Sequence, residues 1–399
     1  MPTPLLIISD AITGPTGLGR ITREVAVRIH EHLADVYRVG VCGYGGTTSR
    51  QFTFAQYPVF KLDNWAIPQL PTIWNDFAGD EKGIMFFIWN ASWLPWVSNP
   101  DMLADGDLKA LLKSDRFSKW GYFPIDAEGP NGRLHESQAE IMAKFDRLAT
   151  YTEFGKKVID LTGMASKFIF NCAVLPHGTE QTVFYPRSRR EARKRFLGEI
   201  GRSSGEHGVT EAVTLLATVA TNTARKDWPL AFETCQELLK RGVNVGMWAH
   251  TDGIKKYWDL PTLAAEFGMK NRVVFTNTHL RDESMAWGYA ACNATLGIGS
   301  GEGWGLPVSE SLAMGIPCVT GDYAGAAEFT PQEFKVTPSA YRYDGYYGNK
   351  RPVYSATEWA DKVMSVIDPA DKPVPLLDRQ YLWSECWAKW EQWLREGAK

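Results

Sequence analysis

The residues best suited to chemistry lie in a glycine-rich stretch at positions 299–315. Within it, Glu302 and Glu310 are separated by seven residues. Glycines let a backbone turn sharply and approach a ligand, and a helix that starts after such a turn presents N–H groups and the positive end of its dipole. A carboxylate near that end stays ionised and accepts hydrogen bonds from hydroxyl groups. We therefore predict an anion-binding turn, lined by Gly303, Trp304, Gly305 and Leu306.

A second group of candidate residues supplies positive charge. The apolar run 213–219 predicts a strand, and the turn after it contains Asn222, Arg225 and Lys226. Guanidinium and ammonium groups beside a helix start are suited to binding a diphosphate. The alternative is a capped helix start whose cations only face solvent.

Two turns in the first part of the chain are also candidates. The first strand runs into a turn with Gly17 and Gly19, which lacks the G-x-G-x-x-G spacing of dinucleotide-binding turns and has an ordinary strand-to-helix turn as its alternative. A Phe-Pro-Ile-Asp sequence ends another strand and leaves Asp126, with Glu128 two residues later, in a glycine loop. Acids in such a loop either hydrogen-bond within their own turn or project toward a ligand.

Short buried strands alternate with helices twice along the chain. This order predicts two doubly wound α/β domains that bind ligands at the carboxyl ends of their strands. A chain of 399 residues is also too long for one ordinary domain. We predict domains at residues 1–186 and 187–375, followed by a C-terminal helix at 376–399. The strand 294–298 and a helix that ends at Gly315 position the glycine-rich stretch.

These motifs resemble those of family 4 of the retaining glycosyltransferases, which have the GT-B fold. The shared features are the Glu-x7-Glu pair, the Arg225-Lys226 pair, the Phe-Pro-Ile-Asp loop and a Pro-His-Gly element at His177. The resemblance covers nearly the whole chain and is stronger in the C-terminal half. For His177 it implies packing at the junction of the two domains in place of a catalytic role.

The chain departs from the family pattern at three positions. Thr221 and Asn222 stand where family members commonly carry an arginine, and Ala326 replaces a glycine two residues before Glu328. One charge contact to the leaving group is therefore missing, or Arg225 supplies it.

The resemblance implies two Rossmann-like domains that face a cleft, with the last helix crossing back to the first domain. It implies transfer of a hexose, with retention, from a nucleotide sugar to a hydroxyl acceptor. We favour a UDP-sugar over a GDP-sugar, and we expect cations and a helix dipole to hold the diphosphate without a metal ion or other cofactor. Residues 1–186 would then bind the acceptor, and residues 187–375 the donor.

The resemblance also assigns roles to single residues. Glu310 is expected to hold the ribose hydroxyls, and Glu302 the hydroxyls of the donor sugar. Asp126 and Glu128 are expected to orient the acceptor hydroxyl group or to accept its proton. The residues expected to act in catalysis are Asp126, Glu302, Lys226 and Arg225. The residues expected to bind the donor are Gly17, Gly19, Asn222, Arg225, Lys226, His250, Gly303, Trp304, Gly305, Leu306 and Glu310.

Composition limits the possible partners. Apolar residues make up 44% and charged residues 22% of the chain, as in globular proteins. A net charge of −3 gives no electrostatic argument for nucleic acid or an anionic membrane as partner. Six scattered cysteines indicate reduced thiols and a cytoplasmic protein, and no apolar run approaches the roughly 20 residues that span a bilayer. The oligomeric state stays open.

The acceptor also stays open. A hydroxymethylated base in DNA is one alternative, as in some viral enzymes of this fold, and the basic run 189–195 would suit it. A lipid or glycan acceptor and a non-catalytic sugar-nucleotide-binding protein are the others. Five tryptophans cluster in and after the irregular segment 52–78, where they either stack on an acceptor or only pin their own loop. They are Trp65, Trp74, Trp89, Trp93 and Trp96.

Overall fold

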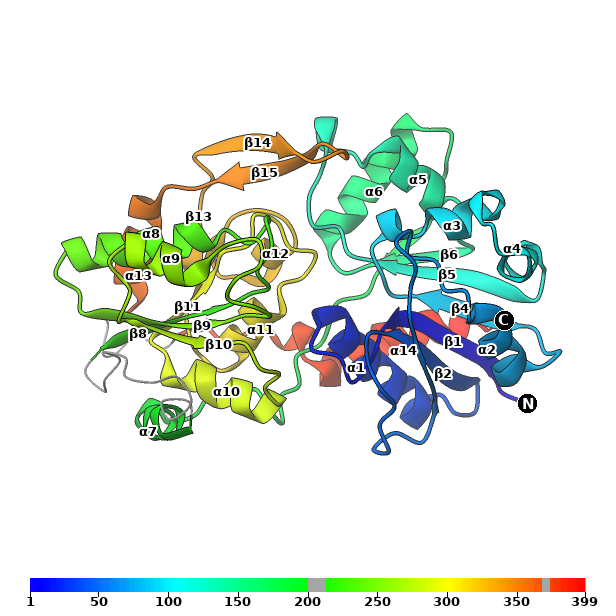
Figure 1. Cartoon of the computed structure of the whole chain (residues 1–399), viewed down its shortest axis with the longest axis horizontal. Coiled ribbons are helices and arrows are strands. Elements are labelled where there is room, and N and C mark those ends of the chain that lie inside the picture. Colours follow the sequence, from blue (N-terminus) through cyan, green and yellow to red (C-terminus); the bar gives the residue numbers. More distant parts are fainter. Residues whose placement is uncertain (200–212, 368–373, 399) are drawn as a thin grey trace. The chain divides into compact units, whose positions relative to one another are not determined.

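The computed structural model describes residues 1–199, 213–367 and 374–398 (Figure 1). The chain forms two compact units. Unit 1 contains Met1–Pro176 and Trp387–Lys399, and unit 2 contains His177–Cys386. These units are defined by contacts alone. The assignment of residues 1–186 and 187–375 to two functional domains remains a prediction.

Unit 1 is built on a seven-stranded parallel sheet with the strand order β3-β2-β1-β4-β5-β6-β7. The strands are β1 (Thr3–Asp10), β2 (Tyr37–Tyr44), β3 (Ala55–Val59), β4 (Gly83–Phe87), β5 (Phe117–Phe123), β6 (Arg147–Thr150) and β7 (Cys172–Val174). The helices between them are α1 (Gly17–His32), α2 (Leu70–Ala78), α3 (Pro95–Ser98), α4 (Gly106–Lys113), α5 (Glu136–Met142) and α6 (Glu153–Ala165). The strand order reverses between β1 and β4, and this is where doubly wound sheets bind ligands.

The segment 52–78 is not irregular as the sequence suggested. It contains β3 and α2. Its prolines hid both elements: Pro58 lies on an edge strand, where a missing N–H is tolerated, and Pro71 lies in the first turn of α2, where a helix accepts proline.

Unit 2 repeats the same winding with six parallel strands, in the order β10-β9-β8-β11-β12-β13. These are β8 (Thr214–Val219), β9 (Val245–His250), β10 (Val273–Thr276), β11 (Ala294–Gly297), β12 (Cys318–Gly321) and β13 (Lys335–Val336). The helices are α7 (Arg189–Glu199), α8 (Trp228–Lys240), α9 (Leu260–Glu266), α10 (Asp282–Ala291), α11 (Leu306–Ala313), α12 (Ala326–Phe329) and α13 (Ala356–Ile367). An antiparallel hairpin, β14 (Ala340–Asp344) with β15 (Asn349–Val353), follows β13 (Figure 1). The sequence analysis had not anticipated this hairpin.

The last helix, α14 (Trp383–Gly397), begins in unit 2 and returns the chain to unit 1, as the resemblance implied. Its tryptophans anchor it there. Trp390 is fully buried, and its indole N–H donates to the carbonyl of Pro176 at 2.9 Å. Tyr37 donates its hydroxyl to the carbonyl of Leu394 at 2.5 Å. The buried tryptophans of α14, which are Trp383, Trp390 and Trp393, are therefore core residues.

Two observations bear on environment. All six cysteines lie in described parts of the chain, are buried and form no disulfide. Within the described ranges, no helix combines the length and the apolar character needed to cross a membrane.

Candidate functional site

The candidate site of unit 2 lies where its strand order reverses, between β8 and β11. The loops that leave these two strands are joined backbone to backbone. Ser300 N–H donates to the carbonyl of Arg225 at 2.9 Å, and Asp227 N–H donates to the carbonyl of Ile298 at 3.1 Å. The glycine-rich stretch and the Arg225-Lys226 turn therefore form one continuous rim at the carboxyl edge of the sheet.

Three charged side chains meet on this rim. Arg225 donates to one carboxylate oxygen of Glu302 at 2.8 Å, and Lys226 forms an ion pair with the other oxygen. Burial raises the pKa of Glu302, but the charges of Arg225 and Lys226 outweigh it and hold that pKa at about 2. The carboxylate is thus ionised at neutral pH. Two cations thus meet at one carboxylate, and such groups are suited to binding an anion.

These side chains are shielded from water to different degrees. The exposed fraction is 11% for the side chain of Lys226, 15% for Glu302 and 31% for Arg225. A charge that is this shielded interacts more strongly with a bound anion than it would in bulk water. Lys226 is the more deeply placed of the two cations.

Helix α11 starts directly after the glycine-rich turn. Gly305 precedes it in the left-handed conformation, with φ of 97°, and Pro307 lies in its first turn. The N-cap residue is Gly305, which has no side chain with which to cap the helix. Glu310 is buried in the helix, with 3% of its surface exposed. This helix start has the features predicted for an anion site.

A neighbouring loop, after β12, supports the glycine-rich turn from behind. Gly325 N–H donates to the carbonyl of Glu302 at 2.9 Å. A Cβ atom at position 325 would overlap the carbonyl of Gly303, so only glycine allows this approach. Ala326, which replaces a family glycine, is buried at the start of α12 and is accommodated there. Glu328, in the same helix, is exposed.

Trp304 has a structural position in the turn. It is 3% exposed, and its indole N–H donates to the hydroxyl of Ser309 at 3.3 Å. Its ring lies 4.6 Å from that of Phe329 and 5.4 Å from that of His177, measured between centroids. Burial lowers the pKa of His177 well below its usual value. The ring is therefore uncharged at neutral pH and serves packing. Trp304 and His177 therefore help to hold the glycine-rich turn against α12.

Two further residues predicted to bind the donor lie at neighbouring strand ends. His250 ends β9, and its ring is 2.7 Å from the hydroxyl of Thr276. Burial, together with the charge of His279, lowers the pKa of His250 to about 4, so the ring is neutral at pH 7. A neutral ring can donate or accept a hydrogen bond but contributes no charge.

Asn222 connects two loops of the protein. Its amide nitrogen donates to the carbonyls of Gly253 and Trp258, both at 2.8 Å, and its amide oxygen accepts from the N–H of Trp258 at 2.9 Å. Both amide hydrogens are therefore used inside unit 2. We assign Asn222 to holding the loops after β8 and β9, and Thr221 beside it is exposed.

The corresponding position of unit 1, between β1 and β4, is built differently. Asp10 accepts from the hydroxyl of Thr16 at 2.6 Å and from the indole N–H of Trp89 at 2.9 Å. Thr16 also caps α1 by accepting from Gly19 N–H at 3.0 Å, and a Cβ at position 19 would overlap the carbonyl of Ala11. Gly19 thus serves packing, whereas Gly17 is exposed at the first position of α1.

Asp126 lies half-buried in the loop after β5, at the same edge of the unit 1 sheet. Tyr151 follows β6, and burial together with the charges of Asp126 and Asp10 raises its pKa well above the usual value. The three side chains are therefore near one another. With Glu128, half-buried in the same loop, they make this edge acidic.

The tryptophan cluster divides into core and surface members. Trp74, Trp89 and Trp96 are fully buried. Trp65 and Trp93 are half-buried and stack in parallel with 4.0 Å between ring centroids. Lys61 places its ammonium 3.1 Å from the Trp65 ring centroid. Because Trp93 and Lys61 both lie against the Trp65 ring, the arrangement favours a self-pinned loop over an open stacking surface.

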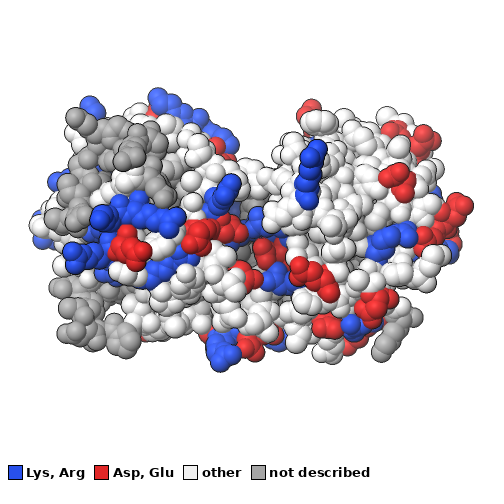
Figure 2. Space-filling model, turned by 90° about the horizontal axis from the view of Figure 1, so that it is seen from below, with Lys and Arg blue, Asp and Glu red and all other residues white. Residues whose placement is uncertain are grey.

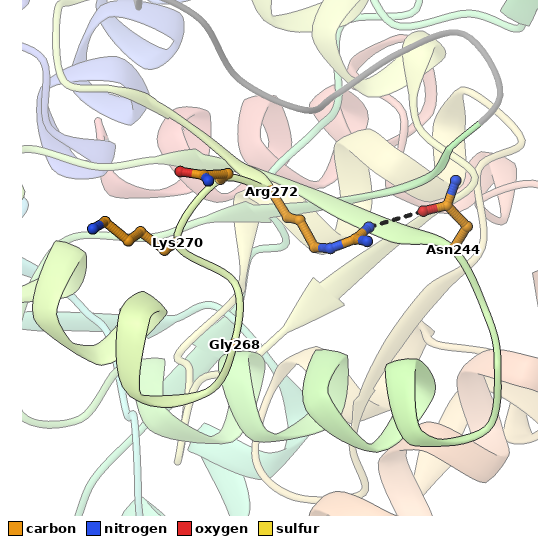
Figure 3. A pocket seen from close by; sticks show the side chains of 5 residues that line it. Asn244, Gly268, Lys270 and Arg272 are labelled. Atoms are coloured by element: carbon orange, nitrogen blue, oxygen red, sulfur yellow. Dashed lines mark hydrogen bonds between the residues drawn. The ribbon is translucent and has the colours of Figure 1, made fainter.

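A hollow of about 400 Å³ lies elsewhere, at the amino ends of β9 and β10 (Figure 3). Arg272 there donates to the side-chain oxygen of Asn244 at 2.8 Å. The other lining residues are Gly268, Lys270 and Asn271. Since the candidate site is at the carboxyl edge of this sheet, the hollow is not part of it.

Metal-ligating groups were sought as clusters of His, Cys, Asp and Glu. Over the described residues no group of three or more such side chains is close enough to hold an ion. The one Asp-x-Asp sequence of the chain, at 105–107, caps α4, because Asp105 accepts from the N–H of Leu108 at 2.9 Å. Independence from metal remains a prediction.

The sequence analysis missed one residue that contacts the site and one that holds it. Arg351 of β15 donates to the carbonyl of Ser300 at 3.3 Å. Tyr323, in the loop after β12, donates to the carbonyl of Lys350 in the same hairpin at 2.7 Å. The signal available in the sequence was the alternation of aromatic and basic residues around Gly345 and Gly348, which is typical of a hairpin.

Comparison with known proteins shows which solved structures share this fold. No family model and no curated protein matches the sequence. Among solved structures, the chain is similar to sucrose-phosphate synthase from Thermosynechococcus elongatus, with 14% identity, coverage of 99% of this chain and 98% of that one, and a TM-score of 0.68. A glycosyltransferase from Rickettsia africae matches with 13% identity, coverage of 99% and 98%, and a TM-score of 0.66.

A third similar structure is HepE from Anabaena in complex with UDP and glucose. It matches with 13% identity, coverage of 97% of this chain and 94% of that one, and a TM-score of 0.65. At these identities the likeness concerns the fold. The two Rossmann-like units of this chain have the GT-B architecture of these glycosyltransferases.

Proposed function

We propose that the protein is a retaining glycosyltransferase that moves a hexose from a nucleotide sugar, with UDP as the favoured nucleotide, to a hydroxyl acceptor. One observation carries the proposal: Arg225 and Lys226 converge on Glu302 in the glycine-rich turn that leads into α11. Such a site suits a diphosphate attached to a sugar. The UDP and glucose bound by the structurally similar HepE support the same donor class.

The proposed roles follow from the charges. Lys226 and Arg225 stabilise the negative charge that develops on the leaving diphosphate, together with the dipole of α11. Glu302 orients the two cations and accepts hydrogen bonds from the donor sugar, and Glu310 holds the ribose. We propose that no metal ion is required, because the two cations and the dipole of α11 stabilise the leaving group in its place.

The proposed reaction is a displacement on the face of the sugar that the leaving group occupies. The bond between the anomeric carbon and the diphosphate oxygen breaks, and the acceptor oxygen bonds to the same carbon. The acceptor proton passes to the departing diphosphate oxygen. In this proposal Asp126 of unit 1 orients the acceptor hydroxyl.

A second acceptor hypothesis, a modified base in DNA, draws on the basic helix α7. Its exposed cations are Arg189, Arg190, Lys194 and Arg195. Figure 2 shows a group of Lys and Arg side chains on this side of unit 2, with acidic side chains among them. Because Glu283 pairs with Arg187 at 2.6 Å beside this helix, the surface is only partly basic. A glycan or lipid acceptor and a non-catalytic sugar-nucleotide-binding protein remain as alternatives.

The experiment that tests the proposal is a screen of radiolabelled UDP-sugars and GDP-sugars, first without acceptor and then with DNA, glycan and lipid acceptors. Slow hydrolysis of one donor without acceptor is the expected first result, with product retaining the anomeric configuration when an acceptor is present. Tight donor binding with no hydrolysis or transfer under any condition would instead identify a non-catalytic binder.

A further inference from the structure

The hairpin β14–β15 has two faces with different chemistry. Its strands pair so that Arg342 lies directly opposite Arg351, and Tyr343 lies opposite Lys350. Opposite residues of an antiparallel pair share a face, and successive residues alternate between faces. One face therefore carries two arginines, and the other carries an exposed tyrosine beside a lysine.

Arg351, on the arginine face, contacts the candidate site. Arg351 is 7% exposed, and its guanidinium joins the carboxylate of Asp344 at 3.3 Å to the carbonyl of Ser300 at 3.3 Å. Arg342, on the same face, is exposed. The hairpin is thus attached to the glycine-rich turn through Arg351.

Three consecutive carbonyls of the glycine-rich turn are held from different directions. The carbonyl of Ser300 accepts from Arg351, that of Gly301 accepts from Arg225 at 3.0 Å, and that of Glu302 accepts from Gly325 N–H at 2.9 Å. A glycine-rich segment has high backbone freedom, and each of these bonds restricts it. The conformation that points the Glu302 carboxylate at Arg225 and Lys226 depends on all three.

We propose that Arg351 is a positioning residue for the donor site, which it serves by fixing the carbonyl of Ser300 and hence the turn that carries Glu302. This inference rests on the proposed function for the identity of the ligand. The hairpin acts as a brace inserted between β13 and α13. Tyr323 is the second attachment of the brace, since its hydroxyl donates to the carbonyl of Lys350 at 2.7 Å.

The buried guanidinium of Arg351 affects both the charge near the rim and the stability of the glycine-rich turn. Arg351 faces one carboxylate, and that carboxylate is 40% exposed, so the arginine adds positive charge close to the rim. The Arg351→Ala substitution removes the hydrogen bond that this charged donor makes to the carbonyl of Ser300. The turn then samples conformations in which the two cations lose their orientation.

The first test needs no donor. Hydrogen exchange of the amides at 299–305 is measured in the ligand-free protein for wild type, Arg351→Ala, Arg351→Lys and Arg342→Ala. Exchange in this segment is expected to become about tenfold faster in Arg351→Ala, partly restored in Arg351→Lys, and unchanged in Arg342→Ala. Arg342→Ala is the matched control, because this substitution removes the same charge from the same face of the hairpin.

The second test measures the donor KM and kcat for UDP-glucose hydrolysis in the same variants. About a tenfold rise in KM, with kcat changed less than about threefold, is expected for Arg351→Ala. A loss of kcat alone, or equal effects of Arg351→Ala and Arg342→Ala in both tests, would overturn the inference. If wild type binds no nucleotide sugar, the proposed function fails, while the exchange result still decides whether Arg351 positions the turn. A lysine variant that folds but restores neither exchange nor KM would also contradict it.

Discussion

The two units have the same winding, yet their equivalent positions carry opposite chemistry. Where the strand order of unit 1 reverses, Asp10 is fixed by Thr16 and Trp89, and Asp126 lies nearby. Where the order of unit 2 reverses, two cations meet one carboxylate. An acidic edge suits a hydroxyl group and its proton, whereas a cationic edge suits a diphosphate.

The comparison also separates glycines that serve packing from those that shape a site. Gly19 in unit 1 allows α1 to approach Ala11. Gly325 in unit 2 allows one loop to support the turn that carries Glu302. Glycine turns that look similar in the sequence therefore have different roles. Only the packing around each turn shows which role it has.

The largest effect is expected for Lys226→Ala. Removing this shielded cation should lower kcat for donor hydrolysis by roughly 10²–10³-fold, as for the loss of one group that stabilises transition-state charge. Lys256→Ala is the control, since Lys256 is half-exposed and pairs with Asp252 away from Glu302. Steady-state kinetics on both variants checks this, and equal rates would remove Lys226 from the mechanism.

Paired glycine substitutions test the packing contrast. Gly325→Ala and Gly19→Ala each place a Cβ against a carbonyl, so each should cost about 1–3 kcal/mol of unfolding free energy in urea. Only Gly325→Ala should also weaken UDP-glucose binding. If Gly19→Ala weakens binding equally at matched folded fraction, the first glycine turn contacts the donor, as the resemblance implied.

Stability at acidic pH tests the charge cluster. The folded pKa of Glu302, about 2, lies below its unfolded value of roughly 4.3, so the ionised form contributes stability above pH 4.3 that is lost as pH falls toward 2. The difference in unfolding free energy between wild type and Glu302→Gln should therefore shrink between pH 5 and pH 2. Urea unfolding at several pH values measures it, and a constant difference would mean that the carboxylate is not paired in solution.

The smallest effect is expected at His250. Its folded pKa of about 4 lies below the unfolded value of roughly 6.5, so the native state disfavours its proton and stability falls as pH drops from 6.5 to 4. His250→Gln should flatten this part of the stability curve. Donor affinity measured between pH 6 and 8 should not change with His250 protonation, and a titration there would show that the ring is charged in the complex.

Much of the architecture could be predicted because it is local. Short buried runs such as β1 and β11, and Pro307 and Gly315 at the ends of α11, are readable from neighbouring residues. The resemblance also brought together Arg225, Lys226 and Glu302, which lie 76 to 77 positions apart in sequence.

What could not be predicted depends on contacts between distant segments. Ser300 and Arg351 are 51 positions apart, and nothing local marks Arg351 as a partner of the turn. The donor-binding role expected for Asn222 remains a prediction, whereas the connection that its amide makes between two loops could not be foreseen. For Trp65 the sequence left a stacking surface and a self-pinned loop open, and the contacts of its ring with Trp93 and Lys61 favour the loop.

The central claim is that the cationic edge of unit 2, and not the acidic edge of unit 1, binds the nucleotide diphosphate. Titration calorimetry of UDP-glucose with wild type, Lys226→Ala and Asp126→Asn tests it most directly. The account predicts that Lys226→Ala weakens binding at least about tenfold, which corresponds to roughly 1.4 kcal/mol, and that Asp126→Asn leaves it unchanged. Binding that is lost in Asp126→Asn and preserved in Lys226→Ala would contradict it.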